Sequence, residues 1–191
     1  MNIGIFSGSF NPVHIGHLIL ANYAVEFTEL DEIWFLVSPQ NPLKEKSGLA
    51  GQDERLKMVE LAIEGYSKFK ASDFEFSLPQ PSYTVNTLNE LSKTYPQHNF
   101  TLIIGADNWK VFPEWKNYKN ILENYSVFIY PRLDNAIEIA GTLRENVRIL
   151  DAPIIEISST FIRESVASQK DMKAFLPDGV LRFIKDNNLY I

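Results

Sequence analysis

The sequence predicts an α/β fold with a doubly wound parallel sheet, in which helices cover both faces of the sheet. Short apolar runs rich in β-branched and aromatic residues recur along the chain, and segments with helical spacing of apolar residues lie between them. Strands that alternate with helices in this way form parallel sheets. Several strand-like runs are followed directly by polar segments, and in such sheets ligands bind beyond the carboxyl ends of the strands, where the strand order reverses.

The strands are predicted from the apolar runs. They span residues 2–7, 32–37, 100–105, 126–131 and 147–150. A further short strand is expected within 69–78, and the run IIEI at 154–157 also has strand character. Four polar segments follow strand-like runs, and we expect them to converge on one edge of the sheet: SGSFNPVHIGH, SPQNPLK, GADNW and SSTFIR. The second belongs to the long loop 38–51, and long loops in compact domains are often functional.

The helices are predicted from apolar residues that recur every three or four positions. They span 15–27, 53–64, 85–94 and 177–187. In the second helix, Asp53 is the expected N-cap. Its expected buried face consists of Leu56, Val59 and Ile63. One more helix is expected to begin near Ser158, where a run of hydroxyl residues can cap it.

The composition is typical of one globular domain, expected over residues 1–191. With 45% hydrophobic and 13% aromatic residues, a chain of this length can bury a substantial core. Cysteine is absent, which excludes disulfides, thiolate catalysis and Cys-based zinc sites, and favours a cytoplasmic location. The N-terminus lacks the basic start of a signal peptide, and the apolar run 18–25 is too short to cross a bilayer, so no membrane association is expected.

The charge balance argues against nucleic acid as a partner. The 24 acidic and 18 basic residues give a net charge of −6, so the field around the molecule repels a phosphate backbone. A small anionic ligand would have to be bound by a few local positive groups instead.

The segment SGSFNPVHIGH at 7–17 contains two glycines, a proline and two of the three histidines of the chain. It enters the first predicted helix near Ile15, so His14, Gly16 and His17 lie in the first turn. Free N–H groups and the positive end of the helix dipole make such a turn an anion site. The two histidines are three residues apart and can point at one phosphate, while the glycine leaves room for a ligand to approach the backbone.

Other phosphate and metal motifs do not fit. GxxxxGK[ST] is absent, and no GxGxxG follows the first strand. Zinc would need about three protein ligands, and beyond His14 and His17 only the distant His98 remains, so no metal ligand is assigned. For this segment alone, a turn with satisfied surface histidines stays an alternative.

A second polar segment, ISSTFIRES at 157–165, has similar properties near the other end of the chain. Ser158, Ser159 and Thr160 lie where a helix should begin, and Arg163 follows one turn later. Hydroxyls, N–H groups and a guanidinium then face the same way. Taken alone, an ordinary N-cap beside a solvated arginine explains the segment equally well.

Together the two segments resemble the HxGH and SSTxIR motifs of the nucleotidylyltransferase superfamily, whose fold is Rossmann-like. Three further features resemble its bacterial nicotinate-nucleotide adenylyltransferases: PSYTVNTL at 81–88, GADNWKVFPEW at 105–115 and the chain length. The resemblance covers essentially the whole chain. It implies that the phosphate of nicotinate mononucleotide attacks the α-phosphorus of ATP and expels pyrophosphate. Such a reaction needs positioned positive charge, and no pairing of a nucleophile with a base.

The resemblance also implies which residues form the site. The catalytic residues would be His14, His17, Lys44 and Arg163. ATP would be bound by Gly8, Ser9, Phe10, His14, Gly16, His17, Gly105, Asp107, Ser158, Ser159, Thr160 and Arg163. The mononucleotide would be bound by Thr84, Trp115, Lys116 and Arg132. Mg²⁺ would accompany ATP, held mostly by phosphates and water.

Particular roles follow from the same resemblance. His17 would meet the α-phosphate, Asp107 would accept hydrogen bonds from the ribose of ATP, and Lys44 would reach in from the loop 38–51. Trp115 would stack on the pyridine ring, and N–H groups near Thr84 and Lys116 would receive the nicotinate carboxylate. For Trp109, core packing is expected instead of ligand contact.

The sequence departs from the family pattern in three places. SGSF stands where GGTF is usual, NPLK replaces PxHK, and PRLD at 131–134 replaces PRPG. The second change removes a histidine beside Lys44. The third leaves Arg132 equally open to a phosphate or substrate contact and to a surface position.

Two alternative functions stay open on the sequence. A sister adenylyltransferase would act on nicotinamide mononucleotide, phosphopantetheine or FMN. A non-catalytic regulatory module would bind nucleotide without turnover. Phosphopantetheine enzymes generally lack the SYT segment and the GAD…W pair, and the intact His14, His17 and Arg163 argue against a pure sensor.

Overall fold

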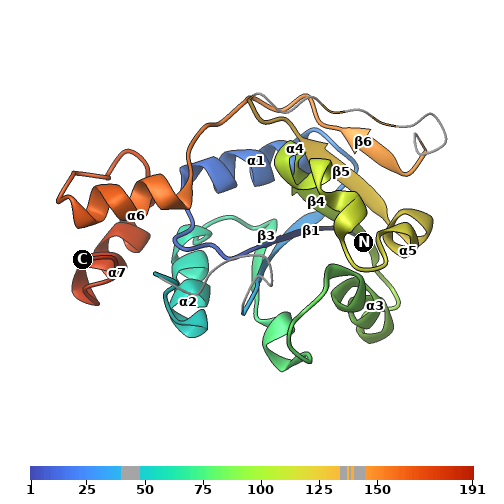
Figure 1. The fold of residues 1–191 in the computed structure, drawn as a ribbon, viewed down its shortest axis with the longest axis horizontal. Helices are drawn as coiled ribbons and strands as arrows, with labels where there is room; N and C mark the ends of the chain where they lie inside the picture. Colours follow the sequence, from blue (N-terminus) through green and yellow to red (C-terminus); the bar gives the residue numbers. More distant parts are fainter. Residues whose placement is uncertain (40–47, 134–136, 138, 140–144) are drawn as a thin grey trace.

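The computed structural model describes residues 1–191 apart from 40–47, 134–136, 138 and 140–144. Its centre is a parallel sheet with the strand order β3-β2-β1-β4-β5-β6 (Figure 1). The strands are β1 (Asn2–Gly8), β2 (Glu32–Val37), β3 (Phe69–Ser72), β4 (Asn99–Gly105), β5 (Ser126–Tyr130) and β6 (Val147–Ile149). The order reverses at β1, because β2 and β3 lie on one side of it and β4 to β6 on the other. The predicted doubly wound α/β fold is confirmed.

Two apolar cores cover the two faces of the sheet, because side chains alternate along each strand. In β2, Ile33, Phe35 and Val37 belong to the first core, and Trp34 and Leu36 to the second. On the first core pack α1 (Ile15–Glu26), α2 (Gln52–Ala62), α6 (Ser159–Ala167) and α7 (Asp178–Asp186). On the second pack α3 (Thr84–Thr94), α4 (Ala106–Lys110), η2 (Phe112–Glu114) and α5 (Tyr118–Asn124).

The strand register brings the loops that follow the strands to one edge of the sheet. Gly8 at the end of β1 pairs with Val37 at the end of β2. Gly105 at the end of β4 pairs with Tyr130 at the end of β5. The β1–α1 loop and the β4–α4 junction therefore flank the point where the strand order reverses, the usual ligand position in this architecture.

Helix α2 differs from its prediction. It begins at Gln52 with Gly51 at the N-cap, so Asp53 is not the cap. Its buried residues are Arg55, Met58, Val59 and Ala62, while the predicted Leu56 is only partly buried. The buried face of α2 is rotated relative to the predicted one. It includes an arginine, and a prediction based on apolar residues alone does not count arginine as buried.

Two predicted strands also need correction. The segment 69–78 forms β3 over its first four residues and then a short 3₁₀-helix, η1 (Phe74–Ser77). Residues 150–158 have no regular secondary structure, so IIEI is not a strand. The segment SSTFIR reaches the site through this extended connection, which Figure 1 shows running from β6 to α6. Helices α4 and α5 were not predicted, since five and seven residues are too few to reveal a helical period.

Among the described residues, no helix has the length and apolar composition that a bilayer crossing requires.

Candidate active site

The β1–α1 loop and the start of α6 are joined by hydrogen bonds between residues about 150 positions apart. Ser159 Oγ donates to the main-chain oxygen of Pro12 at 2.9 Å. Arg163 Nη1 donates to the main-chain oxygen of Asn11, also at 2.9 Å. These bonds place the two predicted motifs against each other at the carboxyl edge of the sheet.

The first turn of α6 is organised as the sequence predicts. Ser158 Oγ accepts a hydrogen bond from the N–H of Phe161 at 3.1 Å and so caps the helix. Arg163 Nη2 lies 3.3 Å from Thr160 Oγ1, which turns the guanidinium back toward the helix start. A guanidinium, two more hydroxyls and the positive end of a helix dipole thus lie together, a combination suited to an anion.

The rings of the two histidines in the first motif lie against each other, tilted by 32°, at the start of α1. His14 occupies the N-cap position, and its ring centroid lies 3.8 Å from that of His17. The N–H of His14 donates to Nδ1 of His17 at 3.2 Å. Because Nδ1 accepts this bond, the neutral imidazole of His17 carries its proton on Nε2. The main chain therefore selects the tautomer that offers Nε2–H as a donor.

His14 is buried and uncharged. Its residue is only 3% exposed. Burial, aided by the positive charge of Arg132, lowers the pKa of His14 to about 4, so the ring is neutral at pH 7. Its Nδ1 atom has no hydrogen-bond partner among the described residues. A buried polar atom left in this condition at the start of a helix is a candidate ligand contact.

Gly16 allows close packing within the chain, and its predicted role in ligand approach stays a prediction. A Cβ atom at this position would lie 3.0 Å from both His14 Nδ1 and Ile155 Cγ2. The space beside this glycine is thus filled by the chain itself. Its lack of a side chain lets the His14 ring and the extended connection before α6 pack closely on α1.

Phe10 has a strained backbone within the first motif. Its φ is +45°, in the left-handed region that is unfavourable for a bulky residue, and it is 3% exposed. The ring packs edge to face against His17 at 5.2 Å and against Phe6 at 5.9 Å. A Cβ on Gly8 would approach this ring to 3.2 Å. The strain is thus accompanied by packing that supports the His17 imidazole.

Arg55 supports the loops of the candidate site and was not singled out from the sequence. It is 1% exposed, and its guanidinium donates to four main-chain oxygens. These are Ser9 at 2.8 Å, Ser38 at 2.7 Å, Pro39 at 2.8 Å and Ala50 at 3.0 Å. Burial lowers the pKa of Arg55 from its usual value. Arg55 ties the β1–α1 loop to the segment after β2 and to the start of α2.

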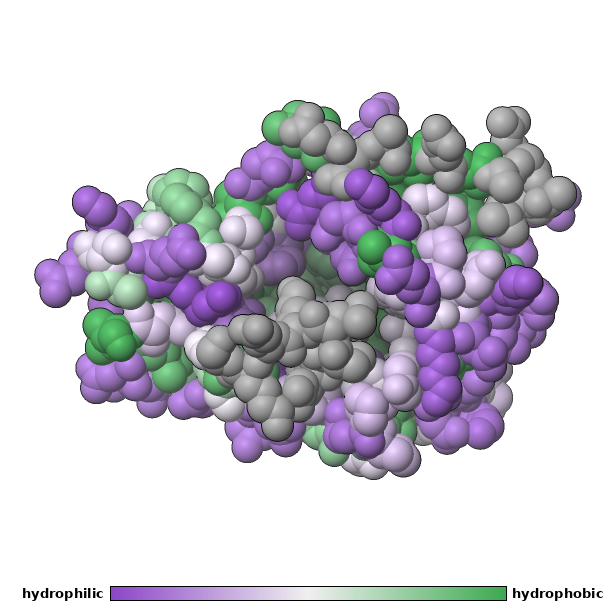
Figure 2. All heavy atoms as spheres, in the orientation of Figure 1, coloured by the Kyte–Doolittle hydropathy of each residue, from purple (hydrophilic) through white to green (hydrophobic). Residues whose placement is uncertain are grey.

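A pocket of about 350 Å³ opens beside the β1–α1 loop, at the carboxyl ends of β1 and β4. Figure 2 shows this face of the molecule hollowed near its centre. Five residues predicted for ligand binding line the pocket: Gly8, Thr84, Gly105, Trp115 and Lys116. The structure thus brings the GADNW and SYT segments together with the first motif. Ser38, which follows β2, lines the same pocket.

Trp109 and Trp115 have different surroundings near the pocket. Trp115 is half-buried, lines the pocket, and has no hydrogen-bond partner for Nε1 among the described residues. Trp109 stacks on Phe112, with the ring centroids 5.2 Å apart, and packs on the second core. Lys116 Nζ lies 4.2 Å from the centre of the Tyr83 ring. Trp115 is therefore the tryptophan available to a planar ligand.

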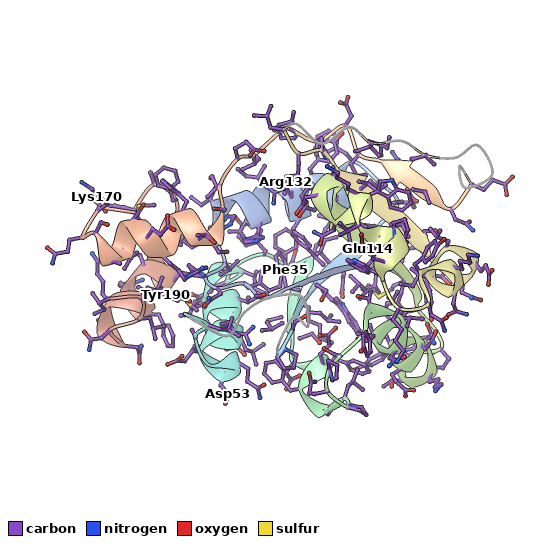
Figure 3. All side chains as sticks on the ribbon, viewed as in Figure 1. Phe35, Asp53, Glu114, Arg132, Lys170 and Tyr190 are labelled. Atoms are coloured by element: carbon purple, nitrogen blue, oxygen red, sulfur yellow. The ribbon has the colours of Figure 1, made fainter. Side chains whose placement is uncertain are left out.

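Arg132 contacts other parts of the chain and is not a solvated surface residue. Its Nη1 donates to the main-chain oxygen of Ile155 at 2.9 Å, and its guanidinium lies 5.2 Å from the Tyr130 ring centre. Its Nε is 3.8 Å from Asp107 Oδ1, a weak pairing because the aspartate is half exposed. A Cβ on Gly105 would overlap Asp107 Oδ1. Figure 3 shows Arg132 near α4, on the side of the site opposite α2.

Glu75 is the second residue that the sequence did not reveal. Its side chain lines the pocket, and the residue is 4% exposed. Oε2 accepts from Ser38 Oγ at 2.9 Å and Ser82 Oγ at 3.1 Å, and Oε1 accepts from Thr87 Oγ1 at 2.9 Å. Burial raises the pKa of Glu75, while the three hydroxyl bonds oppose that rise. This carboxylate holds the end of β2 to the start of α3.

Lys44 lies outside the described residues. Among the residues that the structure does describe, no group of three or more His, Cys, Asp or Glu side chains is arranged to hold a metal ion.

Comparisons with known proteins agree with this geometry. The cytidylyltransferase-like family model matches residues 5–165. Two curated proteins named "Probable nicotinate-nucleotide adenylyltransferase" are similar over nearly their whole length. The relative from Flavobacterium johnsoniae is 50% identical, covering 100% of this chain and 99% of its own. The relative from Bacteroides fragilis is 52% identical, covering 95% of this chain and 90% of its own.

Solved structures share the fold. Plasmodium falciparum nicotinic acid mononucleotide adenylyltransferase complexed with NaAD superposes with a TM-score of 0.82 at 20% identity, covering 99% of this chain and 97% of that one. The same protein complexed with APC gives a TM-score of 0.80 at 21% identity, covering 99% and 96%. On the full-length matches at about half identity, the chain belongs to the cytidylyltransferase-like family and, within it, to the nicotinate-nucleotide adenylyltransferases.

Proposed function

We propose that this protein joins ATP and nicotinate mononucleotide to give nicotinate adenine dinucleotide and pyrophosphate, a step of NAD biosynthesis. Family membership supports the reaction. In this chain, the main structural support for the reaction is the pair of hydrogen bonds that join the start of α6 to the β1–α1 loop. They bring two motifs suited to anion binding against each other. A cytoplasmic location and a single domain over 1–191 stay predictions.

The reaction needs little covalent help from the protein. A phosphate oxygen of the mononucleotide forms a bond to the α-phosphorus of ATP, and the bond from that phosphorus to the oxygen bridging to the β-phosphate breaks. Pyrophosphate leaves with the electron pair. The attacking group is already an anion, so the protein has to align the reactants and neutralise the charge that gathers on the transferring phosphoryl group.

We assign the α-phosphate to His17. Its tautomer, set by the N–H of His14, offers Nε2–H as a preorganised donor. Arg163, Ser159 and Thr160 are assigned to the β- and γ-phosphates, since they surround the start of α6. Lys44 is proposed as a further positive charge for the triphosphate, and Asp107 as the acceptor for the ribose hydroxyls of ATP.

We assign the mononucleotide to the pocket beside Trp115 and the start of α3. The side chain of Tyr83, the N-cap of α3, makes no capping hydrogen bond, so N–H groups of the first turn near Thr84 are available to the nicotinate carboxylate. A site made of N–H donors favours a carboxylate over an amide, which would present its own N–H groups to them. Lys116 and Arg132 add positive charge at the rim.

Mg²⁺ is proposed to enter with ATP. The ion would be held mostly by phosphate oxygens and water. When bound, it would neutralise charge on the leaving pyrophosphate.

The test is pyrophosphate release with Mg-ATP and, in parallel, nicotinate mononucleotide, nicotinamide mononucleotide or phosphopantetheine. We expect turnover with the first and much weaker turnover with the other two. Preference for the amide would overturn the substrate assignment. No pyrophosphate release with any of the three acceptors would favour the non-catalytic binding module.

A further inference from the structure

A tyrosine 179 positions away from the first motif contacts it directly. Tyr190 Oη lies 2.7 Å from Asn11 Oδ1. Figure 3 shows Tyr190 beside α7, on the side of the molecule where α2 and α6 also lie. Burial, the largest cause, raises the pKa of the Tyr190 phenol, so the hydroxyl stays protonated near neutral pH and is the donor in this bond.

The backbone of Tyr190 shows that this contact is maintained against a conformational cost. Its φ is +65°, in the left-handed region that non-glycine residues seldom adopt. Such a conformation persists where surrounding contacts impose it. Here the ring packs on the first core, and the hydroxyl donates a hydrogen bond to Asn11 Oδ1.

Asn11, the partner of Tyr190, is 6% exposed and uses both polar atoms of its side chain. Oδ1 accepts from Tyr190 and from the N–H of Ala50 at 3.1 Å. Nδ2 donates to the main-chain oxygen of Gly48 at 2.9 Å. The tyrosine therefore helps to fix which way the amide faces, because only Oδ1 can accept its proton.

The main chain of Asn11 transmits this restraint to the phosphate site. Its carbonyl oxygen accepts the hydrogen bond from Arg163 Nη1 that seats α6 on the loop. The next residue, Pro12, accepts from Ser159, and His14 follows two positions later. A change in the main-chain conformation at Asn11 would thus displace the two carbonyl oxygens that accept hydrogen bonds from α6, and the histidine pair with them.

We propose that Tyr190 is a positioning residue for adenylyl transfer: through Asn11 it holds the β1–α1 loop in the conformation in which His17 and Arg163 meet the phosphates of ATP. The inference rests on the proposed function. It assigns Tyr190 to the ATP side of the site, with no direct part in binding the mononucleotide.

The test is Tyr190→Phe, which removes one oxygen atom and keeps the ring. We expect kcat to fall about 5- to 20-fold, the effect of losing one buried hydrogen bond that aligns the reacting groups. The KM for nicotinate mononucleotide should stay within about twofold, since the pocket beside Trp115 is untouched. The affinity for a non-hydrolysable ATP analogue, measured by calorimetry, should fall several-fold.

Tyr125→Phe is the matched control. Tyr125 Oη is 3.0 Å from Asn89 Oδ1 and 3.2 Å from Ser92 Oγ, so it also bonds an asparagine oxygen, but beside the second core. The control should lose thermal stability like Tyr190→Phe and keep wild-type kinetic constants at 25 °C. Equal kinetic losses in both variants, or none in Tyr190→Phe, would overturn the proposal.

A double-mutant cycle adds a second check. If Tyr190 acts through Asn11, Tyr190→Phe should cost little further kcat in an Asn11→Ala background. Additive losses would mean that the tyrosine acts by another route. A wild-type protein without turnover would refute the proposed function, and the calorimetric comparison of Tyr190→Phe with Tyr125→Phe would still decide the positioning role.

Discussion

The proposed phosphate end and the proposed mononucleotide end of the site are stabilised by different kinds of hydrogen-bond acceptor. At the phosphate end, Arg55 and Arg163 donate to main-chain oxygens of the β1–α1 loop. At the mononucleotide end, the Glu75 carboxylate accepts from the hydroxyls of Ser38, Ser82 and Thr87. Main-chain acceptors belong to any sequence that adopts this fold, whereas hydroxyls depend on particular side chains. The first end is therefore held by acceptors that the fold itself supplies, whereas the second is held by side chains that a substitution can remove.

The largest effect that this contrast predicts is at His17. His17→Ala removes a preorganised donor from the phosphate end, so turnover should fall roughly 10²–10³-fold. Steady-state pyrophosphate release measures it. His98→Ala is the matched control, since His98 packs against Trp34 away from the pocket and should keep turnover within about twofold. A loss below about threefold at His17 would contradict the assignment of the α-phosphate.

Arg55 tests whether the phosphate end is tied to the fold. Arg55→Met leaves four buried carbonyl oxygens without their donor, and the free energy of unfolding in urea should fall by about 3 kcal/mol. The control is Arg148→Met, an exposed arginine paired with Glu29, which should cost less than about 1 kcal/mol. Similar losses in both variants would show that the main-chain bonds of Arg55 add little.

Trp115 tests the mononucleotide end. Trp115→Ala removes the proposed stacking surface, so the KM for nicotinate mononucleotide should rise about 10-fold or more, with the KM for ATP within about twofold. Trp109→Ala, at the neighbouring packing position, should lower the melting temperature and leave the ratio of the two constants unchanged. A proportional rise of both constants in Trp115→Ala would indicate a packing role.

The smallest predicted effect is a pH dependence of stability from His14. Unfolded, its pKa is near 6.5, and burial lowers the pKa to about 4 in the folded protein. The unfolded chain therefore binds more protons between these values, and stability present above pH 6.5 is lost as pH falls toward 4. Between pH 7 and 5.5 the loss should be about 1 kcal/mol. His14→Asn should lose this component when urea unfolding is compared at the two pH values. If the wild type and the variant lost the same free energy of unfolding between pH 7 and 5.5, the His14 ring would not be buried and neutral.

The sequence predicted the parts of the molecule whose signal is local. The run 32–37 indicates a strand because it is apolar throughout, as expected of a strand covered on both faces. The members of the histidine pair lie within four residues of each other, and Ser158–Thr160 are consecutive, so the residue types in each segment indicate a helix start with anion-binding groups. We expected these two motifs to meet from the strands that precede them and from the resemblance; they do meet, although IIEI, before SSTFIR, is not a strand.

Arg55 and Glu75 were missed because their partners are distant. Within GQDERLK and FEFS they resemble ordinary charged surface residues, and only the folded chain brings four carbonyls to one and three hydroxyls to the other. The alternation of Phe74, Glu75 and Phe76, beside the hydroxyl-rich SYT segment, is the one signal that could have indicated a buried carboxylate. Nothing near Tyr190 in the sequence points to Asn11.

The span of the bonds between the β1–α1 loop and α6 has a consequence for synthesis on the ribosome. A nascent chain that has emerged as far as β5 carries both histidines and the strands that support them. It still lacks Ser159 and Arg163, which follow in the sequence and would complete the proposed anion site. Closure of so large a loop is in addition a late event in folding. Affinity for nucleotide should therefore arise only after Arg163 has been translated, and nascent chains that stop before α6 should not compete with the folded protein for ATP.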